Sequence, residues 1–151
     1  MRKGKTLKNL FLITVIVICG CARADLKIAV HQPQAIQPLE DMEILRVYFP
    51  FASDYIVPET DNGIRQNIEW MNKNPETFVI LEGHCDEVGP KDFNMELGDR
   101  RARAVKAHMI GNGIPAERII MVVSYGSMRP LNPGHTIEDL RQNRRVEFVL
   151  R

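Results

Sequence analysis

The sequence predicts a two-layer α/β (α+β) sandwich in which helices cover one face of a four-stranded sheet. Two observations carry this prediction. Segments of strand character alternate with two amphipathic helical segments in the order βαβαββ, and the patterned part of the chain is about one domain long. Of 151 residues, 44% are hydrophobic and 26% charged, which is ordinary for a globular protein. The folded domain is expected at residues 43–151.

The first strand and the first helix are predicted from residue type and spacing. Residues 44–51 are β-branched and aromatic, which favours a strand. Pro58 suits the first turn of a helix, and apolar residues then recur at three- and four-residue spacings as far as Asn74 and Pro75. We therefore expect an amphipathic helix between Pro58 and this Asn-Pro pair.

A second strand, a loop and a second helix follow. Residues 77–82 are a short apolar run suited to a buried strand, and residues 83–91 are expected to form a loop. Residues 92–109 have helical periodicity, and Gly111 and Gly113 are typical of the end of a helix.

The last third of the chain is predicted to hold two strands. Residues 119–124 are expected to form the third strand, and residues 144–150 alternate as the fourth. Between them, residues 125–142 contain glycine and proline and are predicted to be a long loop. This order of elements places both helices on one face of the sheet.

Residues 1–20 are predicted to be a secretory signal. Arg2, Lys3, Lys5 and Lys8 form a basic head, and the apolar run that follows has nine residues, too few for the roughly 20 that span a bilayer. A buried core helix is the alternative, but the N-terminal position and the basic head favour a signal. Its removal leaves 16 basic and 19 acidic residues, so nothing suggests binding to nucleic acid.

The sequence Ile18-Cys19-Gly20-Cys21 resembles the lipobox of bacterial lipoproteins. Cys21 fits the acylated position better than Cys19 because the small Gly20 precedes it. The resemblance implies acyl chains on Cys21 that give lasting anchorage, and Ala22 implies the periplasmic face of the outer membrane. A secreted protein with a coincidental cysteine is the alternative.

Residues 21–42 are predicted to be a lipidated cysteine and a flexible tether. The segment is polar, contains two prolines and has little periodicity. Cleavage and lipidation would leave Cys85 as the one free cysteine, so no disulfide can form within the mature chain.

Asp86 and Arg101 are the candidate binding residues. Helical periodicity places Arg101 on the core-facing stripe of the second helix, where a guanidinium needs an anionic partner. Asp86 leaves the end of the second strand, where α/β folds tend to place ligands. The guanidinium of Arg101 would donate two parallel hydrogen bonds to a carboxylate, and Asp86 would accept from an ammonium group. Together they would recognise the α-carboxyl and α-amino groups of an amino acid. A salt bridge that only pins the loop remains the alternative.

The segment around these residues resembles OmpA-like peptidoglycan-binding domains. The resemblance rests on Gly83-His84-Cys85-Asp86 and on the sequence from Asn94 through Leu97 to Arg101-Ala102, and it extends from residue 47 to residue 147. It implies a mixed four-stranded sheet and, with the lipobox, a relationship to the peptidoglycan-associated lipoproteins of the Tol-Pal system.

The resemblance also implies a ligand and partners. Asp86 and Arg101 would hold diaminopimelate of the peptidoglycan stem peptide, with Asn94, Leu97, Phe51 and Ala52 around the pocket. No cofactor, metal or catalysis is implied. The implied partners are peptidoglycan, outer-membrane lipid through Cys21 and the translocation protein TolB. The implied function is a noncovalent tether between outer membrane and cell wall.

This sequence departs from the family pattern near the pocket. Pro50 and Ala52 stand where relatives usually carry polar residues, Cys85 replaces Thr or Ala, and Ser127 stands where Glu is common. The first two positions therefore carry no polar side chain for the contacts that relatives make there.

Two alternatives are weighed against this function. Adjacent His84, Cys85 and Asp86 could suggest an enzyme or a metal site, but neighbours along a chain point in different directions, and we interpret His84 as hydrogen-bonded within the loop and Cys85 as packed. The other alternative is a lipoprotein of a secretion or other envelope apparatus. Arg144 and Arg145 are interpreted as a solvated or salt-bridged face.

Overall fold

The computed structural model describes residues 44–151. The predicted signal at residues 1–20, the lipidation of Cys21 and the tether at residues 21–42 lie outside the described residues. The elements are, in order, β1 (Val47–Tyr48), α1 (Pro58–Lys73), β2 (Val79–His84), α2 (Lys91–Gly111), the 3-10 turn η2 (Ala116–Arg118), β3 (Ile119–Gly126), α3 (Ile137–Asn143) and β4 (Arg145–Leu150).

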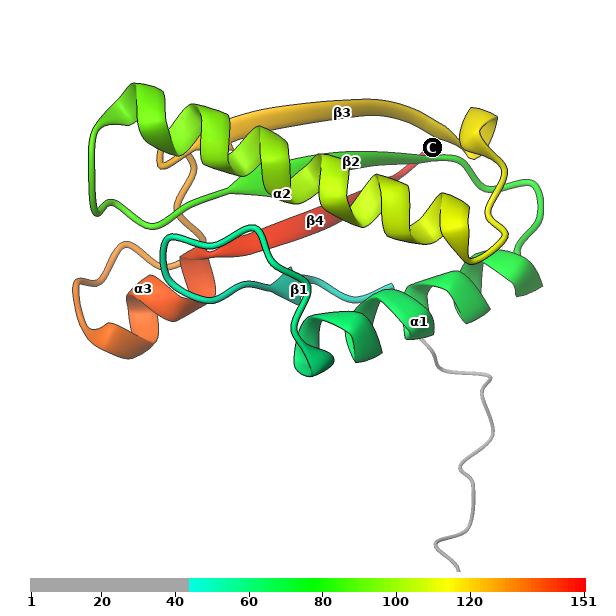
Figure 1. The fold of residues 1–151 in the computed structure, drawn as a ribbon, viewed down its shortest axis with the longest axis horizontal. Coiled ribbons are helices and arrows are strands. Elements are labelled where there is room, and N and C mark those ends of the chain that lie inside the picture. The colour runs from blue at the N-terminus through cyan, green and yellow to red at the C-terminus, as the bar shows by residue number, and fades with distance from the viewer. Residues whose placement is uncertain (1–43) are drawn as a thin grey trace, which may run out of the picture. The chain divides into compact units, whose positions relative to one another are not determined.

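The strands form a mixed sheet in the order β1-β4-β2-β3 (Figure 1). β4 is antiparallel to both β1 and β2, and β2 is parallel to β3. A parallel pair needs a long crossover, and α2 supplies the one between β2 and β3. β4 inserts between β1 and β2 although it comes last in the chain. The predicted two-layer α/β fold and mixed sheet are confirmed.

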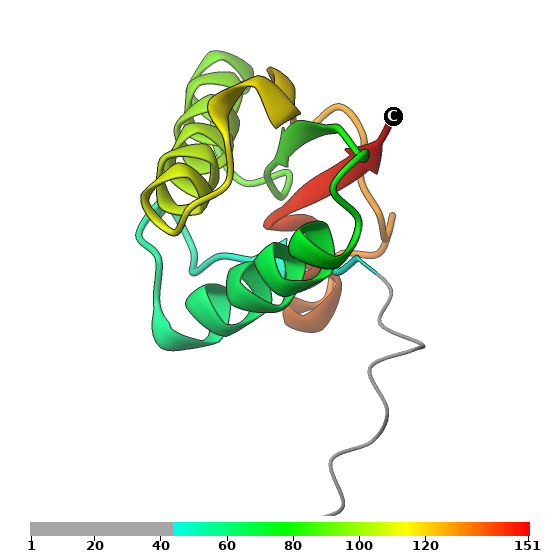
Figure 2. The same cartoon turned by 90° about the vertical axis from the view of Figure 1, so that its right-hand side faces the viewer.

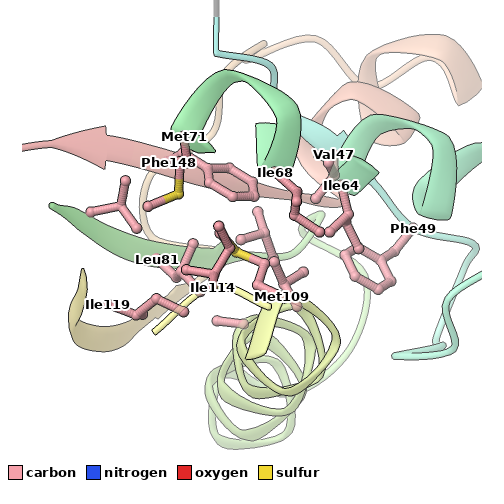
Figure 3. Packing of buried hydrophobic residues seen from close by; sticks show 14 residues of the cluster. Val47, Phe49, Ile64, Ile68, Met71, Leu81, Met109, Ile114, Ile119 and Phe148 are labelled. Atoms are coloured by element: carbon pink, nitrogen blue, oxygen red, sulfur yellow. The ribbon is translucent and has the colours of Figure 1, made fainter. Parts of the chain in front are cut away.

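Both long helices pack on one face of the sheet, and the hydrophobic core lies between the two layers (Figure 2). Figure 3 shows this core closely packed. Alternate residues of β2 and β4 point into it, as a strand requires. Burial of each of these side chains contributes roughly 1.5–3 kcal/mol to the stability of the folded domain. The fully packed side chains of the core are Val47, Phe49, Ile64, Ile68, Met71, Val79, Leu81, Ala102, Val105, Met109, Ile114, Ile119, Val146 and Phe148.

The edge of the sheet at β1 is covered by side chains of α1. Asn67, fully buried, accepts a hydrogen bond from the Leu45 N–H at 2.7 Å and donates to the Leu45 carbonyl at 2.8 Å. Thr60 donates its hydroxyl to the Tyr48 carbonyl at 2.6 Å. Thr60 thus occupies the outward-facing carbonyl of Tyr48 at the edge of the sheet, and Asn67 holds the backbone just before β1.

Several predicted boundaries are wrong. β1 is two residues long instead of spanning residues 44–51, and the chain turns after Pro50, which has no N–H to extend the ladder. The predicted loop at residues 83–91 begins later, because β2 continues through His84. β3 likewise continues to Gly126.

The predicted loop at residues 125–142 contains a helix that the sequence analysis missed. α3 begins after Thr136, whose hydroxyl accepts from the Asp139 N–H while the Asp139 carboxylate accepts from the Thr136 N–H. This reciprocal capping stabilises the first turn of a helix of only seven residues. No helix within residues 44–151 is long and apolar enough to cross a bilayer.

Candidate binding site

The residues that the resemblance assigns to ligand binding lie around one pocket. It has a volume of about 250 Å³ and lies at the carboxyl end of β2, between the start of α2 and the turn that follows β1. The fold brings these side chains together from distant parts of the chain. The six predicted residues all line it: Asp86, Asn94, Leu97, Arg101, Phe51 and Ala52.

The carboxylate of Asp86 is buried and oriented by two hydrogen bonds. One oxygen accepts from the backbone N–H of Val88 at 3.1 Å, which closes a turn of the type that aspartate favours. The other accepts from Nη1 of Arg144 at 3.0 Å. The side chain of Asp86 is 5% exposed, and that of Arg144 is 13% exposed. The ion pair is therefore largely shielded from water, apart from its opening to the pocket.

Arg101 is fully buried and bonds mainly to backbone carbonyls. Its Nε donates to Ser53 O at 2.8 Å, Nη1 to His84 O at 2.9 Å and Nη2 to Pro50 O at 2.9 Å. Burial lowers the pKa of this guanidinium, and the nearby Cys85 and Asp86 oppose the shift.

The salt bridge between Asp86 and Arg101, which the sequence left open as the alternative, does not form among the described residues. Among the described residues Asp86 pairs with Arg144. Arg101 instead donates to carbonyl oxygens and to Cys85 Sγ, which lies 3.4 Å from its Nη1. Four of its five N–H groups are thus occupied. Arg101 holds the turn after β1 against the end of β2 and adds positive charge behind the pocket.

Arg144 is the pocket residue that the sequence analysis missed. Its Nε donates to the Phe49 carbonyl at 3.3 Å and its Nη1 to Asp86, which leaves the Nη2 group without a partner in the described residues. The interpretation of a salt-bridged arginine is confirmed, but the partner was not foreseen. The signal in the sequence is its place immediately before the last strand, in the segment that matches the family.

A close approach of α2 to β2 positions both halves of the pocket. A Cβ on Gly83 would collide with the carbonyl oxygen of Gly98, and a Cβ on Gly98 would collide with Ser124 Oγ. Only glycine permits this backbone contact. It fixes the distance between the strand end that carries Asp86 and the helix that carries Arg101.

The loop between β2 and α2 is held by the first turn of the helix. The Asn94 amide group donates to the carbonyls of Asp86 at 3.3 Å and Val88 at 3.1 Å. Cys85 is buried, its thiol donates to the Asn94 carbonyl at 3.3 Å, and burial raises the pKa of that thiol. Cys85 is packed as expected and is the one free cysteine among the described residues.

The mouth of the pocket is apolar. Phe51 is 60% exposed and Phe93 is 43% exposed, and both border the opening.

The backbone of Ala52, which also lines the pocket, adopts a left-handed conformation with φ of 49°. L residues other than asparagine and aspartate rarely adopt this conformation. A larger hollow of about 500 Å³ lies between β1, α1 and α3, but it contains none of the predicted residues.

The sequence profile of the OmpA family matches residues 48–144. The chain belongs to the OmpA family. As a family member, it is 39% identical over 106 residues to a peptidoglycan-associated lipoprotein of Pseudomonas aeruginosa, covering 70% of this chain and 61% of that protein. The chain spans about three fifths of the length of that relative and of similar proteins from Agrobacterium fabrum and Brucella melitensis.

Solved structures agree with this membership. The peptidoglycan-associated lipoprotein from Burkholderia pseudomallei superposes with a TM-score of 0.64 at 29% identity, over 70% of this OmpA-family chain and 89% of that chain. The C-terminal domain of Helicobacter pylori MotB superposes with a TM-score of 0.66 at 25% identity, over 72% and 85% of the two chains. None of these names describes an enzyme.

Proposed function

We propose that this chain is an outer-membrane lipoprotein that binds peptidoglycan noncovalently and so tethers the outer membrane to the cell wall. Acyl chains on Cys21 would hold the membrane end, and the pocket at the end of β2 would hold the wall. The observation that carries the proposal is the gathering of all six predicted residues around one open pocket that contains a shielded ion pair. The names of the relatives support it.

The charges of the pocket suit an amino acid with free α-amino and α-carboxyl groups. Arg101 and Arg144 supply two positive charges against the single carboxylate of Asp86, so the pocket has excess positive charge for a ligand carboxylate. The Nη2 group of Arg144, which has no partner among the described residues, would donate to it, and the buried Arg101 would add its charge from behind. Asp86 would accept from the ammonium group.

This division of roles favours diaminopimelate of the stem peptide as the ligand. Its free end carries an ammonium and a carboxylate group on one carbon, which is the pair of charges that Asp86 and the two arginines would hold. Phe51 and Phe93 at the mouth would contact the apolar stem of the residue. TolB as a partner rests on the family resemblance alone.

Co-sedimentation with purified peptidoglycan sacculi tests the proposal. We expect the full chain to sediment with sacculi and the Asp86→Asn variant to lose at least about tenfold in affinity, since a lost charged contact is worth about 1.5–3 kcal/mol. Asp92→Asn is the matched control, because Asp92 lies on the exposed first turn of α2.

Competition identifies the ligand. Free meso-diaminopimelate should release the bound chain, and cadaverine, which has the same two amino groups on a five-carbon chain but neither carboxylate, should release far less. Equal sedimentation of the wild type and Asp86→Asn, with both folded by circular dichroism, would show that this pocket does not bind the wall.

A further inference from the structure

A second cluster of ligand-type side chains lies on the face of the sheet opposite the helices. Glu82 and Glu147 are direct cross-strand partners on β2 and β4. His84 follows two residues after Glu82, on the same face of β2. The neighbours Leu81, Val146 and Phe148 point into the core, so this trio points away from it.

His84 is buried without a hydrogen-bond partner. It is 2% exposed, and neither ring nitrogen makes a well-aligned hydrogen bond among the described residues, although the backbone of Arg129 acts on the ring as a weak acceptor. The interpretation of a histidine hydrogen-bonded within the loop after β2 is therefore wrong. Tyr125 stacks on the ring with centroids 5.6 Å apart, and the Arg129 guanidinium lies 3.7 Å above the Tyr125 ring. An unsatisfied buried polar group costs about 1–3 kcal/mol, so this ring would be stabilised by a ligand that bonds one of its nitrogens.

The open atoms of the cluster face one another. Nε2 of His84 lies 4.0 Å from a carboxylate oxygen of Glu82, too far for a hydrogen bond. One ligand atom each from Glu82, His84 and Glu147 lie within 4.8 Å of one another.

From this arrangement we propose that Glu82, His84 and Glu147 bind a divalent transition-metal ion of the zinc type. One imidazole nitrogen and two carboxylate oxygens are a donor set that Zn²⁺ accepts, with water completing the shell. Zinc bonds of about 2.0–2.2 Å require the three atoms to close by roughly 1 Å, which side-chain rotation of the two glutamates can supply. The site is separate from the peptidoglycan pocket and does not depend on its function.

Two arginines beside Glu147 are expected to weaken the affinity of the site for a metal ion. The Nε of Arg145 lies 2.6 Å from Glu147 Oε1, and the Nε of the half-exposed Arg46 lies 3.3 Å from the same atom. These bonds leave the second oxygen of Glu147 for the ion but place positive charge beside it. Removal of Arg46 should therefore tighten metal binding, which no folding defect would imitate.

Equilibrium dialysis of the full chain against ZnCl₂ in detergent tests the proposal. We expect saturable uptake at this site, weakened about 10- to 100-fold in Glu82→Gln and tightened several-fold in Arg46→Gln. Glu82→Gln keeps the shape of the side chain. His135→Gln is the control, because His135 contacts a single carboxylate, Glu87, and both are exposed; it should bind as the wild type does.

A nuclear magnetic resonance measurement keeps the test decisive if a variant misfolds. On addition of ZnCl₂ to the wild type, the ¹⁵N resonance of His84 Nε2 should shift to the position of a metal-bound imidazole. Uptake that is equal in the wild type and Glu82→Gln, uptake that is lost in His135→Gln, or an unmoved His84 resonance would each overturn the proposal.

Discussion

At the scale of single residues, the domain contains a histidine that resists protonation. Burial is the main cause that lowers the pKa of His84 to about 4, and the charge of Arg145 adds to it. In the unfolded chain the pKa of a histidine is near 6.5. Between these two values the unfolded chain takes up a proton that the folded chain excludes.

The stability of the domain should therefore fall as the pH falls from about 6.5 to about 4. The unfolded state binds more protons in this window, so the lost free energy of unfolding approaches about 3 kcal/mol, the equivalent of the shift in pKa. Urea unfolding with EDTA present measures it. His84→Gln should flatten the slope and His135→Gln should not. An equal slope in all three proteins would contradict the shift.

The left-handed backbone conformation of Ala52 should lower the free energy of unfolding. A left-handed conformation costs an ordinary L residue roughly 1–2 kcal/mol, and asparagine tolerates it. Ala52→Asn should raise the free energy of unfolding by about 0.5–1 kcal/mol, as measured by urea titration. Ala52→Val is the opposite control and should destabilise; a gain in both variants would rule out strain as the cause.

At the scale of elements, the sequence predicted what periodicity and residue type determine. The two long helices and the last two strands were placed within a few residues, because their apolar spacing, Pro58 and the terminal glycines are local signals. α3 was missed because the capping pair Thr136 and Asp139 was hidden among glycines and prolines. The place of Arg144 in the pocket was missed because its partner, Asp86, lies 58 positions away, and no local sequence pattern indicates a contact between them.

The contact between β2 and α2 should tolerate no side chain at Gly83. Gly83→Ala would place a methyl group against the Gly98 carbonyl, and neither backbone can yield without moving the helix. We expect a loss of stability of about 1–3 kcal/mol or more in thermal or urea unfolding. Gly111→Ala, at the end of the same helix with open space around it, should be neutral or slightly stabilising. Comparable losses in both would contradict the close approach.

The edge protection by α1 should be equally measurable. Asn67→Ala removes two hydrogen bonds and leaves the backbone groups of Leu45 unpaired, which should cost about 2–4 kcal/mol. The exposed Asn62, in the same helix, is the control and should change stability by less than about 0.5 kcal/mol when replaced with Ala. Equal losses in the two variants would contradict a structural role for Asn67.

At the scale of the whole molecule, Arg101 joins segments that are far apart in sequence. Arg101→Lys keeps the charge but cannot reach the carbonyls of Pro50, Ser53 and His84 together. We expect a loss of about 2–4 kcal/mol in the free energy of unfolding together with weaker binding to sacculi. The neighbouring, more exposed Arg100 gives the matched control, Arg100→Lys. Unchanged stability with lost binding would show a direct role in ligand capture instead.

The central position of β4 in the sheet has a consequence for a chain made from its N-terminus onward. Before β4 has been synthesised, β1 has no strand to pair with and β2 has no partner on that side. Asp86 also has no ion-pair partner until Arg144, which immediately precedes β4, is part of the chain. A growing or interrupted chain therefore has no usable pocket, however much of α1, β2 and α2 it already contains. Completion of the pocket therefore depends on the last few residues of the domain, so truncation at its C-terminal end should abolish the site while leaving most of the helices in the chain.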